Sequence, residues 1–497
     1  MSDAQKAVPA AQAAAAEKEE VNLLDQIVDE GRLARDAGAR ERSRDLVREF
    51  VSQVLEGEMT VSRDAEAMIN ARLAQIDHLI SIQLNEVLHH PQFQKLEGSW
   101  RGLKYLLDQS ETSVQLKIKI LNVSKRDLLR DLQRAPEFDQ SALFKKIYEE
   151  EFGIFGGAPF ASMVGDYEFG RGPEDLELLE KVSQVAAAAH APFLTAAAPE
   201  MFNMDSYSNL DAPRDIAKIF DTTEYAKWKS FRDSEDSRYV GLALPHILMR
   251  QPYGRDGVQV DAFHYEEGVD GTDHTKYLWG NAAYALGARL TNSFASYGWC
   301  ASIRGVEGGG LVEGLPVHTF QTDSGDVAMK CPTEVAVTDR REKELADQGF
   351  IPLVHCKGTD YAAFFSAQSC QKPKMYDKEA ATSNARIAAQ LPYILAMSRF
   401  AHYMKVIMRD KIGSFMSRGD CERFLNQWIV QYVTEDDSAS AETKAQYPLR
   451  EAKVEVMEVP GKPGAYRAVA FLRPHFQLDE LTVSLRLVTE LPQTARK

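Results

Sequence analysis

The sequence predicts an α/β protein of the mixed α+β kind, with long helices on either side of an α/β body and further strands at its end. Three observations support this prediction. Between Phe160 and Gly358, short apolar runs alternate with helical segments, as in a mixed or mostly parallel sheet. Before and after this body, apolar residues recur at spacings of three and four, which is typical of amphipathic helices. Between Glu451 and Leu491, three runs alternate apolar and polar residues, as half-buried strands do.

The N-terminal part is expected to be a flexible arm over residues 1–40 and a helical region over residues 41–110. The arm is rich in alanine and charged residues, and its one apolar island, Val21–Val28, is too short to fold alone. The island either covers its own domain or adds to a neighbouring surface. Spacing and caps predict helices from Arg40 to Gly57, from Ser62 to Leu88 and from Phe93 to Leu107.

The α/β body is expected over residues 111–378. Alternation predicts a strand over Ser113–Val123, and Ser124 is positioned to cap a helix that reaches Gln133. Further strands are expected near Phe160–Val164, Pro192–Ala196, Tyr239–Met249, Trp299–Ile303 and Phe350–Val354. Helices are expected near Pro173–Ala189, Glu224–Asp233, Lys276–Tyr297 and Asp339–Gln348.

The C-terminal part divides into helices over residues 379–433, a polar linker over 434–450 and strands over 451–497. Pro392 should kink or divide the long helical stretch, because proline lacks the amide that continues a helix. A last helix is expected from Asp420, as its cap, to Tyr432. The residues that mark the three terminal runs are Val454 and Val456, then Val469 and Phe471, then Val483, Leu485 and Leu487.

Two interpretations of the terminal strands stay open. Two or three strands form a marginal sheet in water, so their edges must be covered or paired. They could form an edge hairpin packed on its own domain, or a connector that exchanges strands between subunits.

Composition excludes several classes of protein. The 497 residues are 44% hydrophobic and 26% charged, as in soluble globular proteins. The formal charge of −15 argues against nucleic-acid binding and against an anionic membrane surface. No signal peptide and no run of roughly 20 apolar residues is evident, so we expect a cytoplasmic protein with no membrane insertion. The five cysteines form no CxxC pair, and reduced thiols are expected.

A search for catalytic or cofactor motifs finds nothing specific. The sequence holds neither a GxxxxGK[ST] nor a GxGxxG motif, and the glycine-rich stretch 305–310 is best explained as a surface loop. The polar stretch His264–His274 matches no metal-binding spacing. His355 and Cys356 are adjacent and should face opposite sides of a strand, while His318 and His402 are expected to be core histidines. We therefore expect no enzyme activity and no cofactor.

Three stretches resemble one protein family: Phe93–Leu107 (FQKLEGSWRGLKYLL), Arg304–Phe320 (RGVEGGGLVEGLPVHTF) and Ala381–Ser414 (ATSNARIAAQLPYILAMSRFAHYMKVIMRDKIGS). This is the large subunit of the contractile sheath of the bacterial type VI secretion system, known as TssC or VipB. The resemblance runs in order from about Val21 to the end of the chain. It implies a structural protein.

The resemblance also implies partners. Family members pair with a small sheath subunit (TssB or VipA), and the pairs stack in six-fold rings around an inner tube of Hcp protein, attached to a baseplate. Contraction of the sheath propels the inner tube, and the ATPase ClpV then takes the contracted sheath apart. Neighbouring subunits are linked by strand exchange. On this chain the donated strand would carry Leu23, Leu24 and Ile27, and the acceptor strands would lie in 452–491.

The same resemblance suggests that the helix Asp420–Tyr432 faces the inner tube, with Lys411, Arg418 and Arg423 as the candidate contacts. Phe424, Leu425 and Trp428 equally suit an ordinary core helix. Two alternatives to the sheath remain at this stage. One is a cytoplasmic α/β enzyme with an unrecognised site, perhaps around His264–His274, and the other is a scaffold module that forms no sheath.

Overall fold

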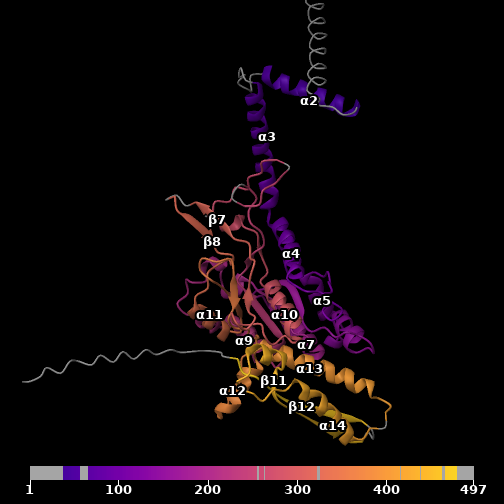
Figure 1. Cartoon of the computed structure of the whole chain (residues 1–497). Helices are drawn as coiled ribbons and strands as arrows, with labels where there is room; N and C mark the ends of the chain where they lie inside the picture. The colour runs from indigo at the N-terminus through magenta and orange to yellow at the C-terminus, as the bar shows by residue number, and fades with distance from the viewer. Residues whose placement is uncertain are drawn as a thin grey trace, which may run out of the picture. The chain divides into compact units, whose positions relative to one another are not determined.

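The computed structural model describes residues 37–55, 65–254, 257–261, 263–271, 273–321, 325–414, 416–436, 438–461 and 465–477 (Figure 1). The chain divides into two units, one of residues 1–82 with 261–265 and one of residues 83–260 with 266–497. The first unit holds helix α2 (Ala37–Leu55) and most of α3 (Ala65–Leu88). The sheet, the helices that cover it and the terminal hairpin all belong to the second unit.

A six-stranded sheet forms the centre of the second unit, in the order β1-β2-β3-β9-β10-β6. Its strands are β1 (Met163–Phe169), β2 (Phe193–Ala197), β3 (Val240–Leu244), β9 (Ile351–His355), β10 (Ala362–Phe364) and β6 (Leu311–Val312). The first four run parallel, and β10 is antiparallel to both of its neighbours. This confirms the predicted α/β fold class with a mixed sheet.

Helices cover both faces of this sheet (Figure 1). Alternate residues of β2 point into two separate cores, because Phe193 packs with one apolar cluster and Leu194 with the other. The first cluster contains α5 (Lys125–Arg134) and α7 (Pro173–Ala189), together with α6 (Ala142–Phe144), η2 (Lys145–Phe152) and α9 (Ala226–Asp233). The second contains α4 (Pro91–Asp108) and α10 (Ala283–Tyr297). The predicted helices at 173–189, 224–233 and 339–348 are present, the last as α11 (Asp339–Asp347).

Small elements complete this unit. Two further antiparallel two-stranded sheets pair β4 (Ile247–Leu248) with β5 (Trp279–Gly280) and β7 (His318–Gln321) with β8 (Val327–Lys330). The shorter helical turns are η1 (Phe138–Gln140), η3 (Pro199–Phe202), η4 (Tyr207–Asn209), α8 (Ala217–Phe220), η5 (Thr223–Tyr225), η6 (Asp236–Tyr239) and η7 (His274–Lys276). None of the described helices combines the length and hydropathy that a bilayer crossing requires.

The C-terminal region is helical and then forms a hairpin. Pro392 divides the long helical stretch as predicted, because α12 (Glu379–Ala388) ends before it and α13 (Leu391–Asp410) has it in its first turn. The next elements are α14 (Arg418–Ile429), η8 (Val430–Tyr432), α15 (Ala441–Gln446), β11 (Leu449–Glu458) and β12 (Tyr466–Pro474). The hairpin of β11 and β12 packs beside α14 (Figure 1).

Four sequence expectations differ from the structure. Asp420 does not cap α14: Ser417 does, and Asp420 is the reciprocal partner in a capping box, three residues on. The linker 434–450 contains the short helix α15, which Ser440 caps. Residues 299–303 form no strand, because Trp299 turns inward to stack on Phe400 at 4.2 Å between ring centroids. Residues 113–123 begin with a turn, in which the amide of Ser113 donates to the carbonyl of Leu116, and they join no ladder among the described residues.

Candidate assembly surfaces

The terminal hairpin packs one face on the chain's own helices. Val454 and Val456 of β11 are fully buried, at 0% and 2% exposure, in a cluster that includes Leu425 of α14 and Phe400 of α13. The opposite face is open to solvent, where Phe471 is 55% exposed. Of the predicted acceptor residues, Val454 and Val456 thus serve the subunit's own core, while Phe471 and the half-buried Val469 belong to the outward face.

The outer edge of β11 is occupied by side chains of α14. Asn426 donates from Nδ2 to the carbonyl oxygen of Val454 at 2.7 Å, and its Oδ1 accepts from the Val454 amide at 2.9 Å. The amide of Val456 donates to Oε2 of Glu422 at 3.1 Å. At the start of the strand, the carbonyl of Leu449 accepts from the amide of Thr434 at 2.9 Å. A side chain that matches both backbone groups of a strand residue replaces a neighbouring strand, so this edge is closed to a further strand.

The outer edge of β12 is open. Val454 lies opposite Ala470 and Val456 opposite Ala468 in the antiparallel register. Because the amides of the two valines point away from β12, these are non-hydrogen-bonded pairs, and the amides of Ala468 and Ala470 also point away from the hairpin. Within the described part of the chain, no hydrogen bond is recorded for the main-chain groups of Ala468, Ala470 or Leu472. The hairpin therefore has one edge that can accept a strand.

Sequence reasoning found the strands but missed the residues that decide their edges. Glu422 and Asn426 lie four residues apart on α14, next to the buried Cys421, Leu425 and Ile429. Polar residues bordering the apolar stripe of a helix are the available signal, since residues at i and i+4 share a face. That signal indicates a polar partner without identifying it.

The structure places the other predicted residues as follows. Leu23, Leu24, Ile27, Val483, Leu485 and Leu487 lie outside the described residues. Lys411 follows α13 and sits over the ring of Phe424, 4.7 Å from its centroid. Arg418 and Arg423 are exposed on the first turns of α14, where Arg423 forms a 3.6 Å ion pair with Asp420. The three candidate tube contacts thus lie at one end of α14.

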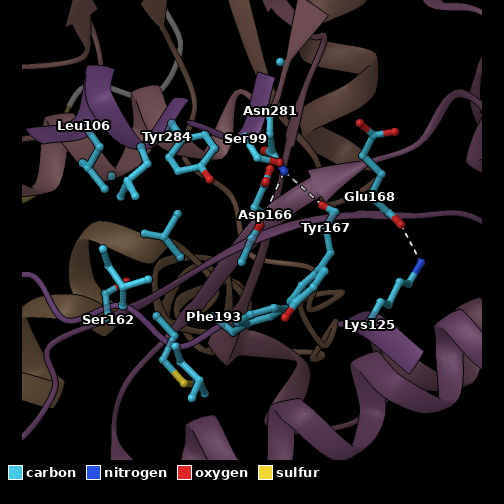
Figure 2. A pocket seen from close by; sticks show the side chains of 18 of the residues that line it. Ser99, Leu106, Lys125, Ser162, Asp166, Tyr167, Glu168, Phe193, Asn281 and Tyr284 are labelled. Atoms are coloured by element: carbon cyan, nitrogen blue, oxygen red, sulfur yellow. Dashed lines mark hydrogen bonds between the residues drawn. The ribbon is translucent and has the colours of Figure 1, made fainter. Parts of the chain in front are cut away.

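A large hollow follows the free edge of β1 and has a volume of about 1990 Å³. Figure 2 shows part of its lining, with Asp166 and Tyr167 of β1 beside Tyr284 of α10. Asn281 donates from Nδ2 to the carbonyl oxygen of Tyr167 at 3.0 Å, and Lys125 donates to the carbonyl oxygen of Glu168 at 2.6 Å. These contacts hold the end of β1 that lies nearest to α5.

Buried ion pairs hold the loops at the carboxyl end of the sheet. His246 contacts Glu168 through Nε2 at 3.0 Å and Glu334 through Nδ1. Burial acts against the charged imidazole, but the two carboxylates outweigh it and raise the pKa of His246 to about 10. The same imidazole keeps the pKa of Glu334 far below its usual range despite burial. His246 is therefore a permanent cation at neutral pH.

The polar stretch 264–274 supplies partners to such ion pairs. Glu267 binds Arg250 through two bonds of 2.6 and 3.0 Å, and His274 lies 3.1 Å from Glu334. Among the described residues, no group of three or more histidine, cysteine or acidic side chains is arranged to hold a metal ion. The stretch thus stabilises the body.

The remaining candidate groups are structural. His402 is 1% exposed and bonds the carbonyl of Ala189 at 2.8 Å, and its burial lowers its pKa to about 3. His318 is likewise buried and bonds the hydroxyl of Tyr277 at 2.7 Å. His355 bonds the carbonyl of Thr359 at 2.8 Å. Its other hydrogen-bonding partner is the thiol of Cys331 rather than the adjacent Cys356. The described cysteines are free thiols.

Comparisons with known proteins agree with this architecture. Residues 70–371 match the family model described as EvpB/VC_A0108, tail sheath N-terminal domain, and residues 380–491 match that of the tail sheath gpW/gp25-like domain. The chain is 52% identical over 457 residues to the type VI secretion system sheath protein TssC1 of Pseudomonas aeruginosa strain PAO1, covering 91% of this chain and 92% of that protein.

Two solved structures from the anti-feeding prophage show a more distant likeness. Its six-fold symmetrised baseplate matches with a TM-score of 0.34 at 10% identity, over 63% of this chain and 66% of the other. Its helical sheath in the contracted state matches with a TM-score of 0.32 at 12% identity, over 62% of this chain and 66% of the other.

The family matches together span most of the residues from 70 to 491. The enzyme alternative is therefore wrong, and the chain belongs to the VipB family of tail sheath proteins.

Proposed function

We propose that the chain is the large subunit of a type VI secretion contractile sheath, which assembles with a small sheath subunit into a helical tube of six-fold rings. The tube would enclose an Hcp inner tube, stand on a baseplate, and be taken apart after contraction by the ClpV ATPase in the cytoplasm. The strongest support is the 52% identity to a TssC1 sheath protein along nearly the whole of both chains.

The one-sided hairpin supports strand exchange as the link between subunits. Its open edge at Ala468, Ala470 and Leu472 can accept a strand, while β11 and α14 anchor it to the subunit body. The donor in a neighbouring copy would be the run of Leu23, Leu24 and Ile27, with the run of Val483, Leu485 and Leu487 as a further strand of the same sheet. Main-chain pairing of this kind can persist while bodies rotate.

The end of α14 is the proposed tube-facing surface. Lys411, Arg418 and Arg423 bring three cations to one end of the helix, whose apolar side is buried against the hairpin. We also propose the functional division into an arm (1–40), a helical region (41–110), a sheath body (111–378), C-terminal helices (379–433), a linker (434–450) and the strand-exchange region (451–497).

Co-expression with the small sheath subunit tests the proposal. Electron microscopy should reveal long hollow tubes, and discrete particles in their place would refute the sheath function.

The variant Ala468→Pro tests strand exchange at β12. It removes an outward amide while leaving the ladder to β11, so it should permit pairing with the small subunit but prevent tube growth. Ala468→Ser keeps the amide and should form normal tubes. Normal tubes from the proline variant would contradict strand exchange at β12.

A further inference from the structure

The residues that follow β12 are tied to the subunit body and not to the hairpin alone. The ladder between β11 and β12 reaches Pro474, and the amide of His475 then donates to the carbonyl of Pro448 at 3.2 Å. Two residues further on, the amide of Gln477 donates to the hydroxyl of Tyr393 in α13 at 3.0 Å. A short bridge thus joins the end of the hairpin to another part of the fold.

The side chain of Gln477 has a partner at each end of its amide. Its Oε1 accepts from Nε of Arg304 at 2.8 Å, and its Nε2 donates to the carbonyl of Ala301 at 3.0 Å. A guanidinium only donates and a carbonyl only accepts, so each amide atom meets a partner that it alone can bond. Arg304 and Tyr393 are 6% and 7% exposed, so packing holds both in place. We call Ala301, Arg304 and Tyr393, with the Gln477 that they bind, the Gln477 latch.

The glycine-rich stretch 305–310 connects the latch to the central sheet. It begins directly after Arg304, and the amide of Gly305 donates to the carbonyl of Phe364 in β10 at 2.7 Å. The amide of Phe364 donates in turn to the carbonyl of Gly310 at 3.0 Å. A Cβ at Gly310 would lie 2.5 Å from the Phe364 carbonyl oxygen, so the close approach requires glycine. Arg304 is therefore held by the sheet, and Gln477 by Arg304.

The latch determines where the following residues leave the subunit. With Gln477 held, they leave beside Ala301 and Tyr393, whereas without the latch they would leave from Pro474, where the ladder ends. The three residues released in this way span about 10 Å when extended. This distance is about twice the 4.8 Å between neighbouring strands. Loss of the latch would therefore lengthen the connection to the next strand by a distance that matters for strand pairing.

We propose that Gln477 is a positioning residue for strand exchange, because the latch fixes the reach of residues 478–491 toward a neighbouring subunit. The latch also transmits a pull on these residues to β10, through Arg304 and the glycine-rich stretch. Without it, the same pull would act on the end of the ladder at Pro474 and open the hairpin from there. The role in strand exchange rests on the proposed function, whereas the latch itself rests on the contacts of Gln477.

Hydrogen exchange of the isolated full chain tests the latch. Gln477→Ala removes both side-chain hydrogen bonds, so the amides of residues 475 and 477 should exchange at least about tenfold faster than in the wild type. The amide of Val469, which pairs toward β11, should be unchanged and shows that the hairpin stays folded. Gln446→Ala is the matched control, because Gln446 is exposed and no side-chain hydrogen bond is recorded for it where the structure describes the chain. Wild-type exchange at residues 475 and 477 in Gln477→Ala would overturn the latch.

Co-expression with the small sheath subunit tests the role of the latch in assembly. Gln477→Ala should pair with the small subunit as the wild type does, but its tubes should be at least about threefold shorter in electron micrographs, because a connection that is too long lowers the effective concentration of its strand. Inserting Gly-Ser-Gly after Gln477 lengthens the connection by the same three residues with the latch intact. This insertion should shorten the tubes equally while leaving exchange at residue 475 unchanged.

The outcomes distinguish this inference from the proposed function. Tubes of wild-type length from Gln477→Ala or from the insertion would overturn the role of the latch in positioning. Loss of pairing in Gln477→Ala would overturn it too, because Gln477 would then serve the fold of the subunit. Failure of the wild-type chain to form tubes would instead refute the proposed function, and the exchange result for the latch would be unaffected.

Discussion

Replacing Asn426 by alanine should loosen the terminal hairpin from α14. The Asn426 side chain satisfies both main-chain groups of Val454, at 2.7 and 2.9 Å, and Val454 is 0% exposed. A buried polar group that loses its partner costs roughly 1–3 kcal/mol. With two such groups and partial access of water after local opening, we expect Asn426→Ala to destabilise the hairpin by about 2–4 kcal/mol.

Native-state hydrogen exchange measures this effect directly. A loss of about 2 kcal/mol corresponds to roughly 30-fold faster exchange of the Val454 amide, at about 1.4 kcal/mol per factor of ten. Asn209→Ala is the matched control, because Asn209 is exposed and no side-chain hydrogen bond is recorded for it in the described part of the chain. If Val454 exchanged within about twofold of the wild-type rate in Asn426→Ala, α14 would not be what closes the β11 edge.

Two further predictions concern the body. His246→Gln should lower the free energy of unfolding by about 1–3 kcal/mol at pH 7, because it removes one partner of the buried Glu334, whose contacts with His274 and Ser206 remain. The pKa of His246 rises from about 6.5 unfolded to about 10 folded, so its contribution is complete below pH 6.5 and is lost as the pH rises through 10. Urea unfolding across this range should show a decline in the wild type that His246→Gln lacks, and parallel curves would contradict the assignment. Gly102→Ala should destabilise the α4–α10 contact by about 1–3 kcal/mol, since its Cβ would lie 2.3 Å from the ring of Tyr284. Gly172→Ala, whose Cβ meets nothing within 4 Å, should leave the thermal midpoint nearly unchanged, and equal midpoints for the two variants would argue against a tight contact.

The helices could be predicted from the sequence because the spacing of their apolar residues is a local pattern. The helix at 173–189 is buried along one face, and Pro392 divides a helical stretch for reasons of backbone chemistry alone. The expected strand at 113–123 has the right alternation but no ladder, since a ladder needs a neighbour that alternation cannot supply. The failed strand at 299–303 shows that an apolar run near an aromatic cluster can be buried without any sheet.

The sites were harder to predict, because they depend on contacts between distant positions. The bond between Asn426 and Val454 joins residues 28 positions apart, and that between His246 and Glu334 joins residues 88 apart. No periodicity encodes such pairs. The expectation of a sheath assembly came from the family resemblance. Only the contacts of Val454 and the register of Ala468 distinguish the hairpin edge that α14 covers from the edge that is free.

The asymmetry of the terminal hairpin also has a consequence for stoichiometry. A strand pair with two equivalent edges could add neighbours on both sides and propagate without limit, as aggregating edge strands do. Since α14 satisfies β11 at Val454 and Val456, each subunit has a single valence there, and two hairpins cannot join through their β11 strands. If subunits exchange strands as proposed, the strands are added in sequence from β12 outward, and the number of donor strands fixes how many chains are linked at each junction. In a lattice built from such junctions, the number of donor strands, and not the concentration of free subunits, would set how many chains join at each junction.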